Sequence, residues 1–309
     1  MANRYLEQLN TSPLVRTFIS RTVGSEGGPI EALISRLESI APTPRSRVSQ
    51  RDIFDLFAKR NIKDCVYVRD VPYEACLEPL GSSFDEGFRI ALNRSRSYER
   101  QRFSLLHELC HTFFYEVVPE LRFKPSGTDD AEEYLCNFGA SNLLVPADDL
   151  KRRSHNKGTC FTTLHELCAY YEVSQQVLLY RLKAVGRWKD VALSSWRLSD
   201  DGRFLMSGIL GRSRDMSWTW HDLGNTLWQA WETGLASGRT VVICTAKQGL
   251  TGSDPVYFEV VKRGETLYAL WSRNPLRRAS GAATLLDLSR KPIKSSISRK
   301  LSSRRIGSI

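Results

Sequence analysis

The sequence predicts an α+β protein made of more than one structural unit. Its 309 residues are about twice the length of a typical domain. Apolar residues with helical spacing prevail over the first part of the chain, whereas short β-branched and aromatic runs prevail after Val191. We therefore expect a helix-rich part that carries a few strands, followed by a part dominated by a sheet.

The helix-rich part is expected to contain six helices and two strands. Ser49 is a candidate N-cap, Pro146 ends a long helix, and Thr163–Ala184 divides into two helices at Glu172-Val173-Ser174. The other predicted helices are Pro29–Ile40, about Ser49–Lys59, Arg100–Glu116 and Asp130–Leu144, and the predicted strands are Cys65–Arg69 and Phe88–Asn93.

The sheet-rich part begins after a boundary near Arg187-Trp188-Lys189. Five strand-like runs surround one predicted helix, Leu223–Ala236. This strand–strand–helix–strand–strand–strand order is typical of a GAF- or PAS-like fold, an antiparallel sheet that often encloses a ligand. The runs are Val191–Leu198, Phe204–Leu210, Thr240–Thr245, Val256–Val261 and Leu267–Trp271.

The net charge is concentrated at the C-terminal end. There are 44 Lys+Arg against 34 Asp+Glu, a formal net charge of +10, and hydrophobic residues make up 41%, which excludes a wholly disordered or fibrous chain. Residues 288–309 hold seven basic residues and no acidic ones, which leaves about +3 (10 − 7) for the rest. This tail is either a solvated terminus or a weak, salt-sensitive contact for a polyanion.

Cysteine usage and hydropathy favour a cytoplasmic protein with no membrane partner. The seven cysteines are odd in number and form no Cys-x-x-Cys pair, which argues against a secreted disulfide framework and a cysteine-cluster zinc site. No apolar run approaches the roughly 18 residues of a membrane span. The N-terminus also lacks the apolar core of a signal peptide.

The strongest chemical signal is the pentapeptide His107-Glu108-Leu109-Cys110-His111. On a helix, residues i and i+4 lie on one face, so both imidazoles can reach one Zn²⁺ at about 2.0–2.1 Å. Glu108 is rotated about 100° from His107, where it can act as a general base on a water polarised by the zinc.

A near-repeat of this motif serves as a negative control. His165-Glu166-Leu167-Cys168 has the same first four residue types, but Ala169 stands where the second histidine would be. Without a second imidazole one turn away, no helical two-histidine site can form. We interpret His165 as a surface or packing residue.

A catalytic zinc site also needs a third protein ligand and an open position. The predicted helix Asp130–Leu144 places Glu133, Asn137 and Ala140 on one face, at i, i+4 and i+7. Glu132 and Glu133 are both candidates at this point. The alternative for either is a solvated acid in the first helical turn, which the helix dipole favours.

Two separated motifs together resemble the ImmA/IrrE-type bacterial metallopeptidases, whose pattern is R-F-T-x-A-H-E-x-G-H followed by E-x-x-A-N-x-F-A-A-x-L-L-M-P. Arg102-Phe103-Ser104-Leu105-Leu106 precedes the histidine motif, and the second pattern matches in register from Glu133 to Pro146. The resemblance covers about residues 28–150. It implies a zincin-like peptidase domain in which Zn²⁺ is held by His107, His111 and Glu133, with Glu108 as the catalytic base.

The chain departs from the family pattern at Cys110, Cys136 and Gly139. We interpret the two thiols as small buried hydrophobic groups. The alternative is that a cysteine, such as Cys76 on a strand bordering the cleft, occupies the open zinc position and inhibits the enzyme until it is displaced. The donor that would stabilise the oxyanion is open, with candidates Tyr98, Tyr115 and His155.

Residues 159–189 look like a helix-turn-helix, and similar proteins carry such a unit between the peptidase and a GAF-like region. In a DNA-binding version the second helix would enter the major groove, where Gln175 and Gln176 could read adenine. No basic residue precedes Arg181 in that helix, and Glu166 and Glu172 would repel DNA. A structural connector is favoured, and a DNA reader is the alternative.

The sheet-rich part holds six of the seven tryptophans. They are interpreted as core residues, or alternatively as a surface on which a base or small ligand stacks. The basic residues Arg273, Arg277 and Arg278 leave a nucleic-acid effector, such as single-stranded DNA, as an option. The six tryptophans are Trp196, Trp218, Trp220, Trp228, Trp231 and Trp271.

We expect four parts: a zinc metallopeptidase domain (1–158), a helix-turn-helix connector (159–189), a GAF-like sensor domain (190–287) and a basic flexible tail (288–309). By resemblance, the protein is a cytoplasmic zinc endopeptidase that cleaves a helix-turn-helix repressor. A stress or DNA-damage-type signal would trigger cleavage and derepress a stress, mobile-element or defence operon. The alternative is a DNA-binding transcriptional regulator whose zinc site is structural.

Overall fold

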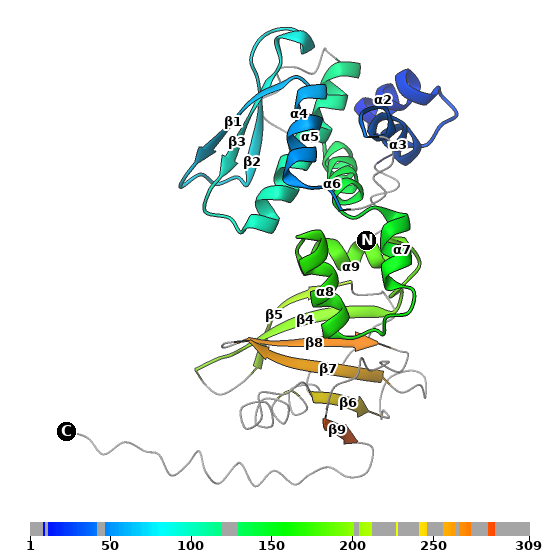
Figure 1. The fold of residues 1–309 in the computed structure, drawn as a ribbon, viewed down its shortest axis with the longest axis vertical. Helices are drawn as coiled ribbons and strands as arrows, with labels where there is room; N and C mark the ends of the chain where they lie inside the picture. Colours follow the sequence, from blue (N-terminus) through cyan, green and yellow to red (C-terminus); the bar gives the residue numbers. More distant parts are fainter. Residues whose placement is uncertain are drawn as a thin grey trace, which may run out of the picture. The chain divides into compact units, whose positions relative to one another are not determined.

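The computed structural model describes residues 9, 12–41, 47–118, 129–200, 204–211, 227, 241–245, 256–263, 266–272 and 284–287. The chain forms two compact units (Figure 1): residues 1–157 with 162–189, and residues 158–161 with 190–309. Helices and sheets both occur, as the sequence predicts. Among the residues that the structure describes, none of the helices combines the length and apolar character that a membrane crossing requires.

The first unit contains a three-stranded sheet in the order β1-β3-β2. Strand β1 (Ile62–Val68) runs parallel to β3 (Phe88–Asn93), and β2 (Ala75–Pro79) runs antiparallel to it. The helix α4 (Gln50–Lys59) packs against β1, and α5 (Tyr98–Val117) packs against β2 and β3. A short 3₁₀ helix, η1 (Phe84–Glu86), precedes β3. The sheet edge formed by β2 therefore borders α5.

The remaining helices of this unit surround α5. Helices α2 (Pro13–Val23) and α6 (Asp130–Leu144) contact α5, and α3 (Pro29–Ile40) contacts α2 and α6. Three further helices follow: α7 (Ala147–Ser154), α8 (Phe161–Tyr171) and α9 (Gln175–Ala184). Helices α3 and α6 have the predicted bounds, and the Ser49 side chain accepts a hydrogen bond from the Asp52 N–H as the N-cap of α4.

The prediction of a single helix within the first fifty residues is wrong, because α2 is a second one. Five of its eleven residues are β-branched, which lowers intrinsic helix propensity. The structure shows what compensates: Phe18 is fully buried, and its ring centroid lies 4.4 Å from that of Phe114 on α5. Tertiary packing, which the local pattern does not reveal, stabilises this helix.

Helices α5 and α6 approach closely at Gly139. A Cβ atom at this position would lie 2.6 Å from the Sγ of Cys110 and 3.3 Å from a methyl group of Leu33. Cys110 and Leu33 are fully buried. The small residue on α6 therefore permits the close approach of α5 and α6.

Gly139→Ala is expected to destabilise the first unit by about 1–2 kcal/mol, since the overpacking cost exceeds the helix propensity gained. In a Cys110→Ala background the sulfur is absent, and the same substitution should become neutral or stabilising. Urea unfolding of the four proteins in the cycle measures both effects. If Gly139→Ala has the same effect in both backgrounds, the close contact is not what selects glycine.

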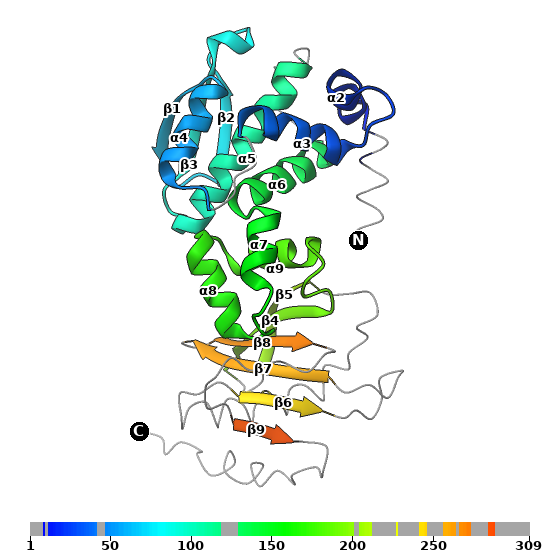
Figure 2. The ribbon, with the colours of Figure 1, turned by 45° about the vertical axis from the view of Figure 1, so that its right-hand side comes forward.

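The second unit is a six-stranded sheet in the order β5-β4-β8-β7-β6-β9 (Figure 2). Neighbouring strands are antiparallel except β6 and β9, which are parallel. The strands are β4 (Val191–Leu198), β5 (Phe204–Leu210), β6 (Val241–Thr245), β7 (Val256–Arg263), β8 (Thr266–Ser272) and β9 (Thr284–Asp287). Strand β9 was not predicted, and the other five match the predicted runs to within two residues.

Two of the predicted core tryptophans are described and are buried. The indole N–H groups of Trp196 and Trp271 both donate to the hydroxyl oxygen of Ser194, at 2.8 and 2.9 Å. The core interpretation therefore holds for these two. Several other predicted features lie outside the described residues: the helix Leu223–Ala236 apart from Leu227, the tail 288–309, Arg273, Arg277, Arg278, Trp218, Trp220, Trp228 and Trp231.

Candidate metal centre and active site

The helices α5 and α6 bring His107, His111 and Glu133 together. The Nε2 atoms of the two histidines are 3.1 Å apart. The carboxylate oxygens of Glu133 lie 3.2 Å from Nε2 of His107 and 3.5 Å from Nε2 of His111. One nitrogen from each histidine and one carboxylate oxygen therefore converge on a single point.

These three side chains fit a zinc ion. Two ligand atoms at about 2.0–2.1 Å from a tetrahedral zinc are about 3.3–3.4 Å apart, close to the separations of 3.1, 3.2 and 3.5 Å seen here. Imidazole nitrogen and carboxylate oxygen are also the donors of catalytic zinc sites with an open fourth position. The spacing and chemistry of the donor set thus match the predicted metal.

The outer ring nitrogens of both histidines are held by α6. Nδ1 of His107 lies 3.1 Å from Oδ1 of Asn137, and Nδ1 of His111 lies 2.6 Å from a carboxylate oxygen of Glu132. The interpretation of Glu132 as a solvated first-turn acid is therefore wrong. The contacts of Glu132 and Asn137 were missed from the sequence, although acids and amides commonly bind the second nitrogen of a ligand histidine.

The charges around His111 and Glu133 shift the pKa of each group in the direction opposite to burial. Burial alone would lower the pKa of His111, but the hydrogen bond and charge of Glu132, with the charges of Glu108 and Glu133, raise it to about 9. Burial would raise the pKa of Glu133, but the hydrogen bond with His107 and the charges of both histidines lower it. Glu133 is thus held as a carboxylate, the form that binds a metal.

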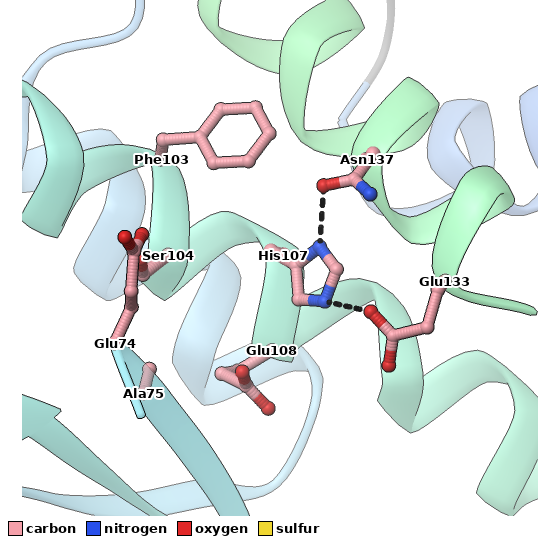
Figure 3. Close-up of a pocket in the computed structure, with 8 residues that line it drawn as sticks. All are labelled: Glu74, Ala75, Phe103, Ser104, His107, Glu108, Glu133 and Asn137. Atoms are coloured by element: carbon pink, nitrogen blue, oxygen red, sulfur yellow. Dashed lines mark hydrogen bonds and ion pairs between the residues drawn. The ribbon is translucent and has the colours of Figure 1, made fainter. Parts of the chain in front are cut away.

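Glu108 lies beside His107 among the residues that line a pocket (Figure 3). The pocket has a volume of about 220 Å³ and is lined by Glu74, Ala75, Phe103, Ser104, His107, Glu108, Glu133 and Asn137. Glu108 is only 8% exposed. Burial raises the pKa of its carboxyl, against the charges of His111 and His107 and a hydrogen bond from the Leu77 N–H. A raised pKa makes this carboxylate a better proton acceptor.

The first candidate oxyanion donor, Tyr115, lies close enough to the site for its pKa to respond to the charges there. Burial raises the pKa of Tyr115, as do the charges of Glu132, Cys76 and Glu108. Tyr98 begins α5, nine residues before His107, and its hydroxyl donates to Glu172. His155 follows α7 and is paired with Arg187. None of Tyr98, Tyr115 and His155 is among the residues that line the pocket.

None of the described cysteines belongs to the cluster of His107, His111 and Glu133, although Cys136 lies with His111 and Glu132 in a second group that could hold a metal ion. Cys76 is exposed on β2 and is not part of the pocket lining. Burial and the charges of Glu108 and Glu78 raise its pKa, which disfavours the thiolate that an inhibitory contact would need. Cys110 and Cys136 are fully buried with raised pKa values caused mainly by burial, consistent with small hydrophobic packing groups.

Comparison with known protein families identifies the class of this domain. Residues 79–183 match the family described as "IrrE N-terminal-like domain", a peptidase family. This segment is therefore similar to the IrrE N-terminal-like peptidase family, which confirms the resemblance predicted from the two motifs. The matched segment includes both α5 and α6 and extends almost to the end of α9.

A particular relative is the Radiation response metalloprotease IrrE of Deinococcus deserti, to which the chain is 36% identical over 101 residues. The aligned region covers 30% of this chain and about a third (35%) of the relative's length. Among solved structures, a Mycobacterium tuberculosis transcriptional regulator aligns with 84% of this chain and 82% of its own, at 11% identity and a TM-score of 0.46. That likeness is too low to bear on function.

Proposed function

We propose that this protein is a zinc-dependent endopeptidase that cleaves a partner transcriptional repressor. The observation that carries the proposal is the convergence of His107, His111 and Glu133 beside the buried carboxylate of Glu108. A stress or DNA-damage-type signal would trigger cleavage and derepress a stress, mobile-element or defence operon. The name of the relative, a radiation response metalloprotease, supports a signal of this kind.

The residues of the pocket support a hydrolytic mechanism. A zinc ion bound by His107, His111 and Glu133 would supply Lewis acidity toward a water molecule and the scissile carbonyl. Glu108 accepts the proton of the attacking water and then delivers it to the leaving amine nitrogen. Its burial keeps this carboxylate away from bulk solvent. The donor to the oxyanion stays open among Tyr98, Tyr115 and His155.

The second unit is proposed to be a GAF-like sensor. Its six-stranded, mostly antiparallel sheet supports an architecture of the GAF or PAS type. A ligand derived from nucleic acid, such as single-stranded DNA, remains the proposed effector. The cytoplasmic location is likewise a prediction.

The rival function, a DNA-binding regulator with a structural zinc, receives less support from α8 and α9. Arg181, the first basic residue of α9, is 4% exposed and donates to the backbone carbonyl of Val145. Gln175 is hydrogen-bonded to His165. A buried arginine cannot neutralise DNA phosphates, so this pair of helices is better explained as a structural connector.

The test is incubation of the protein with the repressor encoded beside its gene, with and without single-stranded DNA. We expect a discrete repressor fragment in the presence of zinc, its loss after chelation, and its return when zinc is restored. Chelation removes the ion that activates the water. If the fragment forms equally well with the metal removed, the proposed mechanism is wrong.

A further inference from the structure

One helix, α6, contacts the outer ring nitrogens of both histidines of the candidate metal centre. The ring nitrogens that face away from the convergence point both contact α6 side chains: Asn137 for His107 and Glu132 for His111. Carboxylate and amide oxygens only accept hydrogen bonds, so each imidazole donates from its Nδ1–H. Each ring then turns its Nε2 toward the convergence point, where the two Nε2 atoms are 3.1 Å apart.

This arrangement makes Nε2 the metal-binding nitrogen of each ring. Only a ring nitrogen without a proton can bind a metal, and an acceptor beside Nδ1 leaves Nε2 as the atom that gives up its proton to a metal. The acceptor also fixes the angle of the ring. Without it, each ring could adopt several orientations.

We propose that Glu132 and Asn137 are positioning residues that orient the rings of both histidines with Nε2 toward the metal position. The inference rests on the proposed zinc site and adds to it the role of two α6 side chains in orienting the histidines. Glu133 supplies the third ligand, Glu132 the acceptor for His111, and Asn137, one turn after Glu133, the acceptor for His107. Three side chains within six consecutive positions thus contribute to the centre.

The start of α6 is fixed, as such a role requires. The Asp129 carboxylate caps the helix by accepting from the N–H groups of Ala131 and Glu132, and it also accepts from the Ser12 hydroxyl at 2.5 Å. The close contact between Gly139 and Cys110 sets the distance to α5. The acceptors therefore stand on a rigid element.

The two contacts differ in strength. Glu132 is a charged acceptor at 2.6 Å, and its side chain and that of His111 are 17% and 13% exposed. Asn137 is a neutral acceptor at 3.1 Å in a more exposed position. Charge-assisted hydrogen bonds are about twice as strong as neutral ones, so the loss of Glu132 should have the larger effect.

The experiment compares Glu132→Ala and Asn137→Ala with the wild-type protein by zinc competition against a chromophoric chelator. We expect zinc affinity to fall by about 10–100-fold in each, with Glu132→Ala at the upper end. Glu132→Gln and Asn137→Asp keep an acceptor oxygen and should recover most of the affinity. Matched controls on the same helix are Asp130→Ala, which also removes a first-turn acid, and Asn142→Ala.

A second comparison separates positioning from helix stability. If Glu132→Ala folds poorly, Asn137→Ala tests the same idea on His107. Recovery of zinc affinity in Asn137→Asp, which restores only the acceptor oxygen, is not expected from a change in helix stability alone.

The outcomes separate the inference from the proposed function. If the alanine variants bind zinc as tightly as Asp130→Ala and Asn142→Ala, or if the acceptor-keeping variants lose as much affinity as alanine, the positioning role is overturned. Wild-type protein that binds no zinc overturns the metal site and this inference together. Tight zinc binding without repressor cleavage leaves the positioning role standing and counts against the proposed function.

Discussion

Glu108→Gln should leave zinc binding intact and reduce repressor cleavage by about 10²–10⁴-fold, the usual contribution of a general base. The carboxylate is not among the three converging ligands, so its replacement leaves the donor set whole. Glutamine has nearly the same shape, and it still accepts the hydrogen bond from the Leu77 N–H through its amide oxygen. What it cannot do is accept the proton of the attacking water.

The chain supplies its own control for this substitution. Glu166 occupies the same place in the near-repeat His165-Glu166-Leu167-Cys168, and it is exposed and paired with Lys157. Glu166→Gln is expected to cleave like the wild type. Zinc content and cleavage rate are measured on the same preparations. If Glu108→Gln retains full cleavage activity, Glu108 is not the base; if neither protein cleaves but both bind zinc, the structural-zinc alternative gains support.

How far the site could be predicted from sequence depends on the range of each interaction. The two histidines are one helical turn apart, so a local period suffices to place them on one face. The choice of Glu133 over Glu132 required a second motif, because its partners lie on another helix. The hydrogen bonds of Asn137 and Glu132 depend on how α6 meets α5, and no local pattern encodes that geometry.

The same distinction applies to the fold. Helices with a cap and a regular apolar face, such as α3 and α6, were predicted with their bounds. Helix α2 was not predicted because its β-branched residues disfavour a helix, although Ser12 caps it and Pro13 begins it. Burial of Val15, Phe18 and Ile19, including the contact of Phe18 with Phe114, adds tertiary stabilisation. Strand β2 is short, and its pairing with β3 is non-local, so the sequence there gave only a weak signal.

A second non-local contact is made by the N-terminal part of α5. Arg102 on α5 is 1% exposed, and its guanidinium lies 2.9 Å from the carboxylate of Glu172 and donates to the Val48 carbonyl at 2.7 Å. Glu172 forms the turn between α8 and α9, with a φ of +54°. The same carboxylate also lies 3.4 Å from Arg47, whose side chain is 39% exposed. The carboxylate of Glu172 is therefore paired with a buried arginine and with an exposed one.

Glu172→Met is expected to destabilise the first unit by about 3–5 kcal/mol, because it leaves the buried guanidinium of Arg102 without an opposite charge. Methionine has a similar unbranched length, so the backbone strain at this φ is unchanged and the lost charge dominates. Adding Arg102→Met removes the stranded charge, and the double variant should be more stable than Glu172→Met alone. Urea unfolding followed by far-ultraviolet circular dichroism measures the four members of the cycle.

Arg47→Met is the matched control, since it breaks the exposed pair of the same carboxylate and should cost only about 0–1 kcal/mol. A large difference between Glu172→Met and Arg47→Met would mean that the turn between α8 and α9 holds α5 in place five residues before His107. A helix-turn-helix that reads DNA has no need of such an internal anchor, whereas a connector built into the peptidase unit does. Equal, small effects of the two substitutions would remove this argument for the connector.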